Sequence, residues 1–134
     1  MIPTILVVQD NTLNLELVRD VLLTAGMNVV EARTADEGLK AALKLGTAVI
    51  LLDIRLPGMD GFALLGRLRA NPVTASIPVV ALTAQAMVGD REQALAAGFS
   101  DYISKPIDTR TMADRIRALI VPGRSPRSAG GTAA

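Results

Sequence analysis

Four strand-like runs in this sequence, three of them apolar, each lead into polar residues that could do chemistry. The runs are residues 5–8, 48–52, 78–82 and 101–104. The polar residues that follow them are, in order, Gln9 with Asp10, then Asp53, Thr83 and Lys105. If the runs are parallel strands, two carboxylates, a hydroxyl and an ammonium meet at one edge of a sheet. In open α/β sheets that edge is where ligands bind.

Together these residue types could support phosphoryl transfer. A carboxylate can attack phosphorus to give an aspartyl phosphate, and Asp53 is the expected acceptor. Two anions repel at that step, so a hard cation is needed. Mg²⁺, or Mn²⁺ in its place, binds through one or two carboxylates while keeping several waters, and Asp10 would hold it. Lys105 would offset charge on the phosphoryl oxygens, and Thr83 would donate a hydrogen bond to one of them.

Helical segments that alternate with the strands must position these residues. Helices are expected at residues 13–25, 34–45, 61–70, 90–97 and 109–121. Such alternation predicts an α/β fold, flavodoxin-like and doubly wound, (βα)5, with a five-stranded parallel sheet. The run at 27–32 contains Asn28 and Glu31, which favours an edge strand and the strand order 2-1-3-4-5. In that order the crevice opens between the first and third strands.

Composition excludes several classes of function. The 134 residues include no cysteine and no histidine, so there is no thiolate zinc site, thiol nucleophile or phosphohistidine on this chain. The net charge is +1, with 12 basic and 13 acidic residues before Pro122, which argues against nucleic-acid binding. We find no signal peptide and no apolar run of membrane-spanning length, so we expect a cytoplasmic protein without a membrane partner.

The chain divides into one domain and a tail. Residues 1–121 carry the alternating pattern and have the length of a single domain. Residues 122–134 are rich in Pro, Gly, Ser and Ala, have no periodicity, and are expected to be disordered. The methionine close to the first strand favours an intact small protein over a domain excised from a larger one.

Four segments resemble the receiver domains of bacterial two-component response regulators. The segments are residues 5–11 (ILVVQDN), 51–61 (LLDIRLPGMDG), 79–84 (VVALTA) and 101–106 (DYISKP), and the resemblance covers about residues 4–121. It implies the roles given above, and adds the backbone carbonyl of Arg55 as a metal ligand and a cis bond between Lys105 and Pro106. It also implies that Thr83 and Tyr102 move together as a switch on phosphorylation.

One position departs from the family pattern. The family usually has two acidic residues where this chain has Gln9 and Asp10. The resemblance puts Asp10 directly on the metal and the other acid mainly behind water. An amide keeps an acceptor oxygen but removes a negative charge, so weaker Mg²⁺ binding is predicted, and not its loss.

Some of these residues have simpler structural interpretations. Asn11 is expected to cap the helix that follows, and Asp60 favours a turn and helix cap over a metal ligand. Thr34 and Glu37 have the spacing of a capping box. Asp10, Thr83, Lys105 and Tyr102 each have an ordinary structural reading when taken alone. Their joint placement at one edge favours a functional site.

The sequence is compatible with three functions. The leading one is a phosphoacceptor switch that takes phosphate from a sensor histidine kinase or a histidine phosphotransfer protein and signals to a downstream protein. It would assist its own phosphorylation and dephosphorylation without acting on an outside substrate. The second is a receiver-like interaction module that no longer needs phosphorylation, with Gln9 as a sign of drift. The third is a Mg²⁺-dependent phosphohydrolase, or a flavin or nucleotide binder. Whether the domain forms a homodimer stays open.

Overall fold

The computed structural model describes residues 2–44, 46–54, 60–83, 88–104 and 108–120. These residues form five strands and five helices that alternate along the chain. The strands are β1 (Thr4–Val8), β2 (Asn28–Ala32), β3 (Val49–Asp53), β4 (Val79–Thr83) and β5 (Asp101–Ser104). The helices are α1 (Thr12–Thr24), α2 (Ala35–Lys44), α3 (Gly61–Ala70), α4 (Asp90–Ala97) and α5 (Thr109–Ala118).

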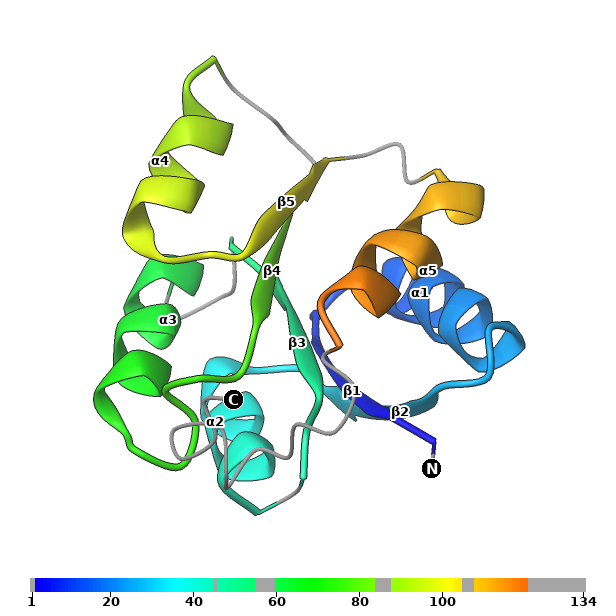
Figure 1. Cartoon of the computed structure of the whole chain (residues 1–134), viewed down its shortest axis with the longest axis horizontal. Helices are drawn as coiled ribbons and strands as arrows, with labels where there is room; N and C mark the ends of the chain where they lie inside the picture. The colour runs from blue at the N-terminus through cyan, green and yellow to red at the C-terminus, as the bar shows by residue number, and fades with distance from the viewer. Residues whose placement is uncertain (1, 45, 55–59, 84–87, 105–107, 121–134) are drawn as a thin grey trace.

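The strands form one parallel sheet in the order β2-β1-β3-β4-β5 (Figure 1). This confirms the predicted fold class and strand order, including the place of β2 at an edge. The helix and strand bounds agree with the predicted ranges to within three residues. Because every strand runs the same way, all five carboxyl ends lie along one edge of the sheet.

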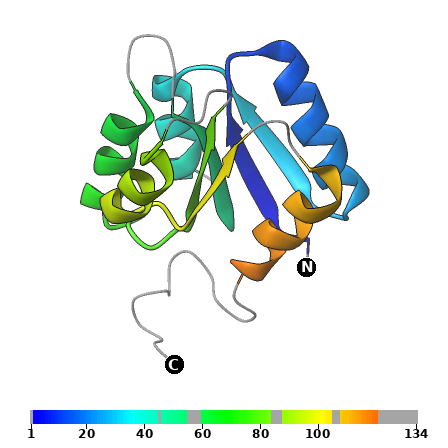
Figure 2. The same ribbon diagram turned by 90° about the horizontal axis from the view of Figure 1, so that it is seen from above.

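Helices cover both faces of the sheet (Figure 2). On one face α2, α3 and α4 enclose a core that includes Leu6, Ile50 and Leu65, while α1 and α5 enclose a second core on the other face around Val7, Leu51 and Ile116. Successive strand residues enter the two cores alternately, as the pleat requires. The central strands are therefore buried on both sides, which explains their continuous apolar sequence.

Side chains fix the starts of the helices close to the carboxyl ends of the strands. Asn11 caps α1 by accepting from the Asn14 N–H at 3.0 Å, and Asp60 caps α3 by accepting from the Ala63 N–H at 2.8 Å. Both predicted caps are confirmed. Thr34 likewise accepts from the Glu37 N–H at 3.1 Å, but the Glu37 carboxylate accepts from the Arg33 N–H, one residue earlier than a standard capping box.

Some sequence predictions concern residues outside the described ranges. The proposed tail, residues 122–134, lies outside them, as does Val121. Among the described residues, none of the helices combines the length and apolar character that a membrane span requires.

Gly61 is the point where α3 approaches β3 most closely. Its N–H donates to the Ile54 carbonyl at 2.9 Å. A Cβ added at Gly61 would lie 2.5 Å from Ile54 Cα and 3.0 Å from the Asp53 carbonyl oxygen. Both contacts are with backbone, which cannot move aside as the end of a flexible side chain can. Glycine therefore lets α3 begin directly against the end of β3, next to Asp53.

We predict that Gly61→Ala lowers the free energy of unfolding by about 1 to 3 kcal/mol, because the methyl group would push the start of α3 away from Asp53. Urea denaturation followed by circular dichroism measures this. Gly66→Ala in the same helix is the matched control, since a Cβ there meets no atom within 4 Å. It should stabilise the protein by up to about 1 kcal/mol through helix propensity. Equal stabilities of the two variants would contradict this account.

Candidate functional site

The strand register brings the predicted site residues to one edge of the sheet. Val8 on β1 lies opposite Leu52 on β3, so Gln9 and Asp53 come next on neighbouring strands, with backbones about 5 Å apart. Asp53 lies opposite Leu82 on β4, and Thr83 lies one residue further along that strand. Thr83 in turn lies opposite Ser104, the last residue of β5. Three neighbouring strands, β1, β3 and β4, thus bring Gln9, Asp53 and Thr83 to one edge of the sheet.

The β1–α1 loop holds Asp10 at the surface and Gln9 inside. Gln9 is 1% exposed, its N–H donates to the Ala32 carbonyl at 2.9 Å, and its side-chain Oε1 accepts from the Asn11 N–H at 3.1 Å. Asp10, by contrast, is exposed. The amide oxygen of Gln9 is therefore used within the loop, where it sets the turn that presents Asp10.

Asp53 ends β3 and is partly buried. The alternation of the strand puts it on the same face of the sheet as Leu51, which is the face covered by α1 and α5. Thr83 is fully buried and lies on the other face, on the side of Ala81. A ligand touching both Asp53 and Thr83 would therefore sit over the strand ends. Arg55, the expected carbonyl ligand, lies outside the described residues.

Thr83 and Tyr102 share a face of the sheet. Tyr102 on β5 lies opposite Ala81, two residues before Thr83, and its side chain is 6% exposed within the core under α2, α3 and α4. Residues on one face of neighbouring strands interact directly or diagonally. Thr83 and Tyr102, which the family resemblance pairs as a switch, are thus diagonal neighbours on one face of the sheet. The expected phosphate-binding Lys105 and its bond to Pro106 lie outside the described residues.

An ion pair ties β5 to α5 directly beside Tyr102. Arg115 donates to Asp101 at 3.0 and 2.7 Å and to the Tyr102 carbonyl at 2.8 Å, while Arg91 of α4 lies 4.0 Å from the same carboxylate. Partial burial alone would raise the pKa of Asp101. The hydrogen bonds from Arg115 and the Tyr102 N–H, together with the positive charges of Arg115 and Arg91, have a larger effect in the opposite direction. The pKa of Asp101 is lowered overall from its ordinary value.

The donor set suits a hard divalent cation. Asp10 and Asp53 come from neighbouring strands and offer carboxylate oxygens, while the chain has no cysteine or histidine to favour a softer metal. Within the described ranges no group of three potential metal-ligating side chains is found. Two carboxylates with waters fit Mg²⁺, which seldom uses an all-protein cage.

A comparison with protein families identifies the family of this chain. The chain matches the model of the response regulator receiver domain over residues 5–117. The chain belongs to this family. The resemblance noted in the sequence is thereby confirmed, and the chain is a receiver domain of the kind used in two-component signal transduction.

Named relatives and a solved structure agree. The transcriptional regulator RpaA of Synechocystis is 39% identical over 88% of this chain, which spans about half of RpaA. The polar-differentiation response regulator DivK of Brucella ovis is 34% identical over 90% of this chain and 98% of its own length. A solved structure of the receiver domain of the sensor histidine kinase PA1611 of Pseudomonas aeruginosa has magnesium in its active-site cleft. It is 32% identical to this chain, with a TM-score of 0.82, and the match covers 90% of this chain and 98% of the PA1611 chain.

Two features of this receiver domain were not predicted from the sequence. One is the use of the Gln9 side chain inside the β1–α1 loop. The other is Arg33, whose side chain reaches across from the end of β2 to the same loop. Arg33 follows the last residue of β2 as Gln9 follows the last residue of β1, so a rule that took the polar residue after every strand would also have selected Arg33.

We predict that Asp101→Asn lowers the free energy of unfolding at pH 7 by about 1 to 2 kcal/mol, because it removes the ion pair with Arg115. A larger loss is not expected, since Arg115 is more than a third exposed and water screens the pair. Since the folded-state pKa is lowered, this stability is present above the unfolded-state pKa and is lost as the pH falls through the folded-state value. Urea denaturation at pH 7 and pH 3 should show the wild-type advantage shrinking at the lower pH.

The matched control is Asp114→Asn. Asp114 pairs with Arg117 at 3.1 Å, but the two side chains are 76% and 52% exposed. Asp114→Asn should therefore lower the free energy of unfolding by less than about 0.5 kcal/mol at either pH. A wild-type advantage over Asp101→Asn that grows toward pH 3 would contradict the sign of the shift.

Proposed function

We propose that this receiver domain accepts a phosphoryl group on Asp53 from the phosphohistidine of a sensor kinase or phosphotransfer protein. The observation that carries the proposal is the shared edge. Asp53 ends a central strand, next to the loop that presents Asp10 and to the strand that ends in Thr83. Phosphoryl transfer needs a nucleophile, a cation site and hydrogen-bond donors around one point.

In the proposed reaction a carboxylate oxygen of Asp53 forms a bond to phosphorus while the bond between phosphorus and the histidine nitrogen breaks. The imidazole leaves. Asp10 and Asp53 would hold Mg²⁺, with the Arg55 carbonyl as a further ligand, and Gln9 would act only indirectly by shaping the loop. The cation would supply charge neutralisation between the two anions that must meet. Thr83 and Lys105 would hold the phosphoryl oxygens.

The same residues are proposed to transmit the signal. When Thr83 moves toward a phosphoryl group it changes the packing beside Tyr102, which shares its face of the sheet. Tyr102 is buried here, so the switch requires a second arrangement in which this ring is placed differently. Arg115 bonds both Asp101 and the Tyr102 carbonyl, so the change would reach α5 and a downstream protein bound there. Binding as a homodimer is an alternative output.

A second candidate function is favoured by one observation. Gln9 is neutral, buried and hydrogen-bonded within its loop, which is compatible with an interaction module that does not need phosphorylation. Such a module would bind its partner equally well as wild type and as Asp53→Ala. The proposed receiver switch predicts that phosphorylation changes partner binding.

We predict that acetyl phosphate with Mg²⁺ adds one phosphoryl group to the wild-type chain and none to Asp53→Asn. Intact-protein mass spectrometry measures the addition, and peptide mapping after reduction with borohydride locates it. Asp60→Asn is the matched control, because Asp60 caps α3 and an asparagine can still accept from the Ala63 N–H. It should be labelled like the wild type. Full labelling of Asp53→Asn would refute the assignment, and steady release of phosphate from unrelated esters would favour the phosphohydrolase instead.

We predict that Gln9→Glu binds Mg²⁺ about tenfold more tightly than the wild type, which corresponds to about 1.4 kcal/mol, because it restores a negative charge beside the cation site. Without metal the same variant should be less stable, since position 9 is 1% exposed and a carboxylate there is desolvated. Calorimetric titration and thermal unfolding with and without Mg²⁺ measure both effects. The matched control is Gln93→Glu on the exposed face of α4. Equal Mg²⁺ affinities of wild type and Gln9→Glu would remove the charge argument.

A further inference from the structure

Arg33 places a cation at the same edge of the sheet as the two aspartates. It follows the last residue of β2, Ala32, which lies opposite Val8 of β1. Its N–H donates to the Glu37 carboxylate at 2.9 Å, where β2 passes into the capped start of α2. The backbone of Arg33 is therefore held in place by the β2–α2 connection.

The side chain of Arg33 crosses to the β1–α1 loop. Its Nη2 donates to the Thr12 hydroxyl and, at 3.5 Å, to the Asp10 carbonyl oxygen. These acceptors stand 21 and 23 positions away in the sequence. The guanidinium thus links the end of β2 to the loop that presents the proposed metal ligand, and its contact with Thr12 also fixes the first residue of α1.

Neither of these acceptors carries a charge. Among the residues that the structure describes, no carboxylate lies within ion-pair distance of the Arg33 guanidinium. Glu37 accepts only from the backbone of Arg33. Some other arginines at the surface are paired with a carboxylate, as Arg19 is with Glu31 at 3.1 Å. The Arg33 guanidinium therefore brings a positive charge to the Asp10 loop that no neighbouring ion pair offsets.

This charge acts on the proposed cation site in the same direction as Gln9. Gln9 withholds a negative charge, and Arg33 adds a positive one a few ångströms from the Asp10 backbone. Both raise the local electrostatic potential and oppose a divalent cation. Because Arg33 is exposed, its effect should be strongest at low ionic strength.

We propose that Arg33 is a positioning residue that holds the Asp10 loop while its charge keeps Mg²⁺ affinity low in the unphosphorylated site. The inference rests on the proposed function, in which Asp10 and Asp53 hold the cation. A phosphoryl group on Asp53 adds negative charge and offsets the guanidinium. Mg²⁺ and the phosphoryl group then favour one another, and by linkage this coupling is reciprocal.

The test is calorimetric titration of the full chain with MgCl₂ at low and high ionic strength, comparing wild type, Arg33→Gln and Arg33→Lys. Arg33→Gln removes the charge and should bind Mg²⁺ about three- to tenfold more tightly at low salt. Arg33→Lys keeps the charge and should stay within about twofold of wild type. The difference between Arg33→Gln and wild type should shrink at high salt. Thermal unfolding of each variant reports whether the fold is kept.

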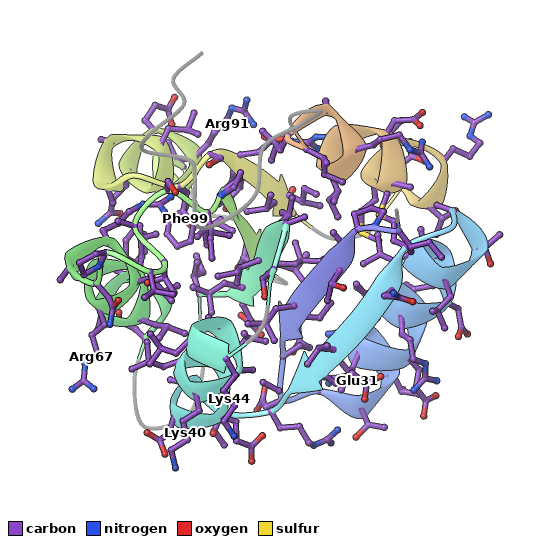
Figure 3. The ribbon with its side chains drawn as sticks, turned by 60° about the horizontal axis from the view of Figure 1, so that its bottom comes forward. Glu31, Lys40, Lys44, Arg67, Arg91 and Phe99 are labelled. Atoms are coloured by element: carbon purple, nitrogen blue, oxygen red, sulfur yellow. The ribbon has the colours of Figure 1, made fainter. Side chains whose placement is uncertain are left out.

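Arg67→Gln is the matched control for net charge. Arg67 lies in the last turn of α3 and projects from the outer side of that helix, away from the sheet (Figure 3). This variant should bind Mg²⁺ as the wild type does. If Arg33→Gln equals the wild type or binds more weakly, the inference is overturned. It is also overturned if Arg33→Lys binds as tightly as Arg33→Gln, because the effect would then come from geometry.

The experiment separates failure of this inference from failure of the proposed function. If the wild type binds Mg²⁺ and is labelled by acetyl phosphate while the Arg33 variants behave identically to it, only the role of Arg33 is wrong. If the wild type neither binds Mg²⁺ nor becomes labelled, the proposed function is wrong and the inference about Arg33 falls with it.

Discussion

The parallel register of five strands is the constraint on which the rest of the molecule depends. Because both faces of β1, β3 and β4 are covered by helices, a charged side chain along those strands would be buried between apolar layers. Polar side chains can therefore occur only past the last apolar residue of each strand. In this register Gln9 and Asp53 come immediately after a matched pair of apolar residues, Val8 and Leu52. The packing that excludes charge from the sheet interior therefore also gathers charge at its edge.

Much of the fold could be predicted because it depends on short-range patterns. Continuous apolar runs located the central strands, and capping side chains such as Asn11 and Asp60 located the starts of helices from residues three positions away. The identity of the candidate site followed from the same patterns, since each polar residue was selected by its place after a strand. Nothing beyond the order of the strands was needed to bring Asp53 and Thr83 to one edge.

The contacts made by long side chains could not be predicted in this way. Arg33 meets Asp10 and Thr12 only after two strands have paired, and Arg69 donates to the carbonyl oxygens of Ala75, Ile77 and Gly98 only after α3 has packed against the sheet. A flexible side chain with several donors has many acceptors in reach, and spacing in the sequence does not choose among them. Partial burial lowers the pKa of the Arg69 guanidinium, which donates to those carbonyls at the cost of some of its contact with water.

At β5 an ion pair and the packing inside the sheet involve neighbouring residues. Tyr102 contributes its ring to the core shared with α3 and α4, its carbonyl accepts from Arg115 of α5, and its neighbour Asp101 pairs with the same arginine. Arg115 therefore holds α5 to the backbone and side chain of the same two residues that place the Tyr102 ring in the core. Arg91 of α4 is held less closely to Asp101, at 4.0 Å, than Arg115 is, at 2.7 Å. Of the two ion pairs on Asp101 the longer one, to Arg91, is the weaker, so this carboxylate holds α5 more closely than it holds α4.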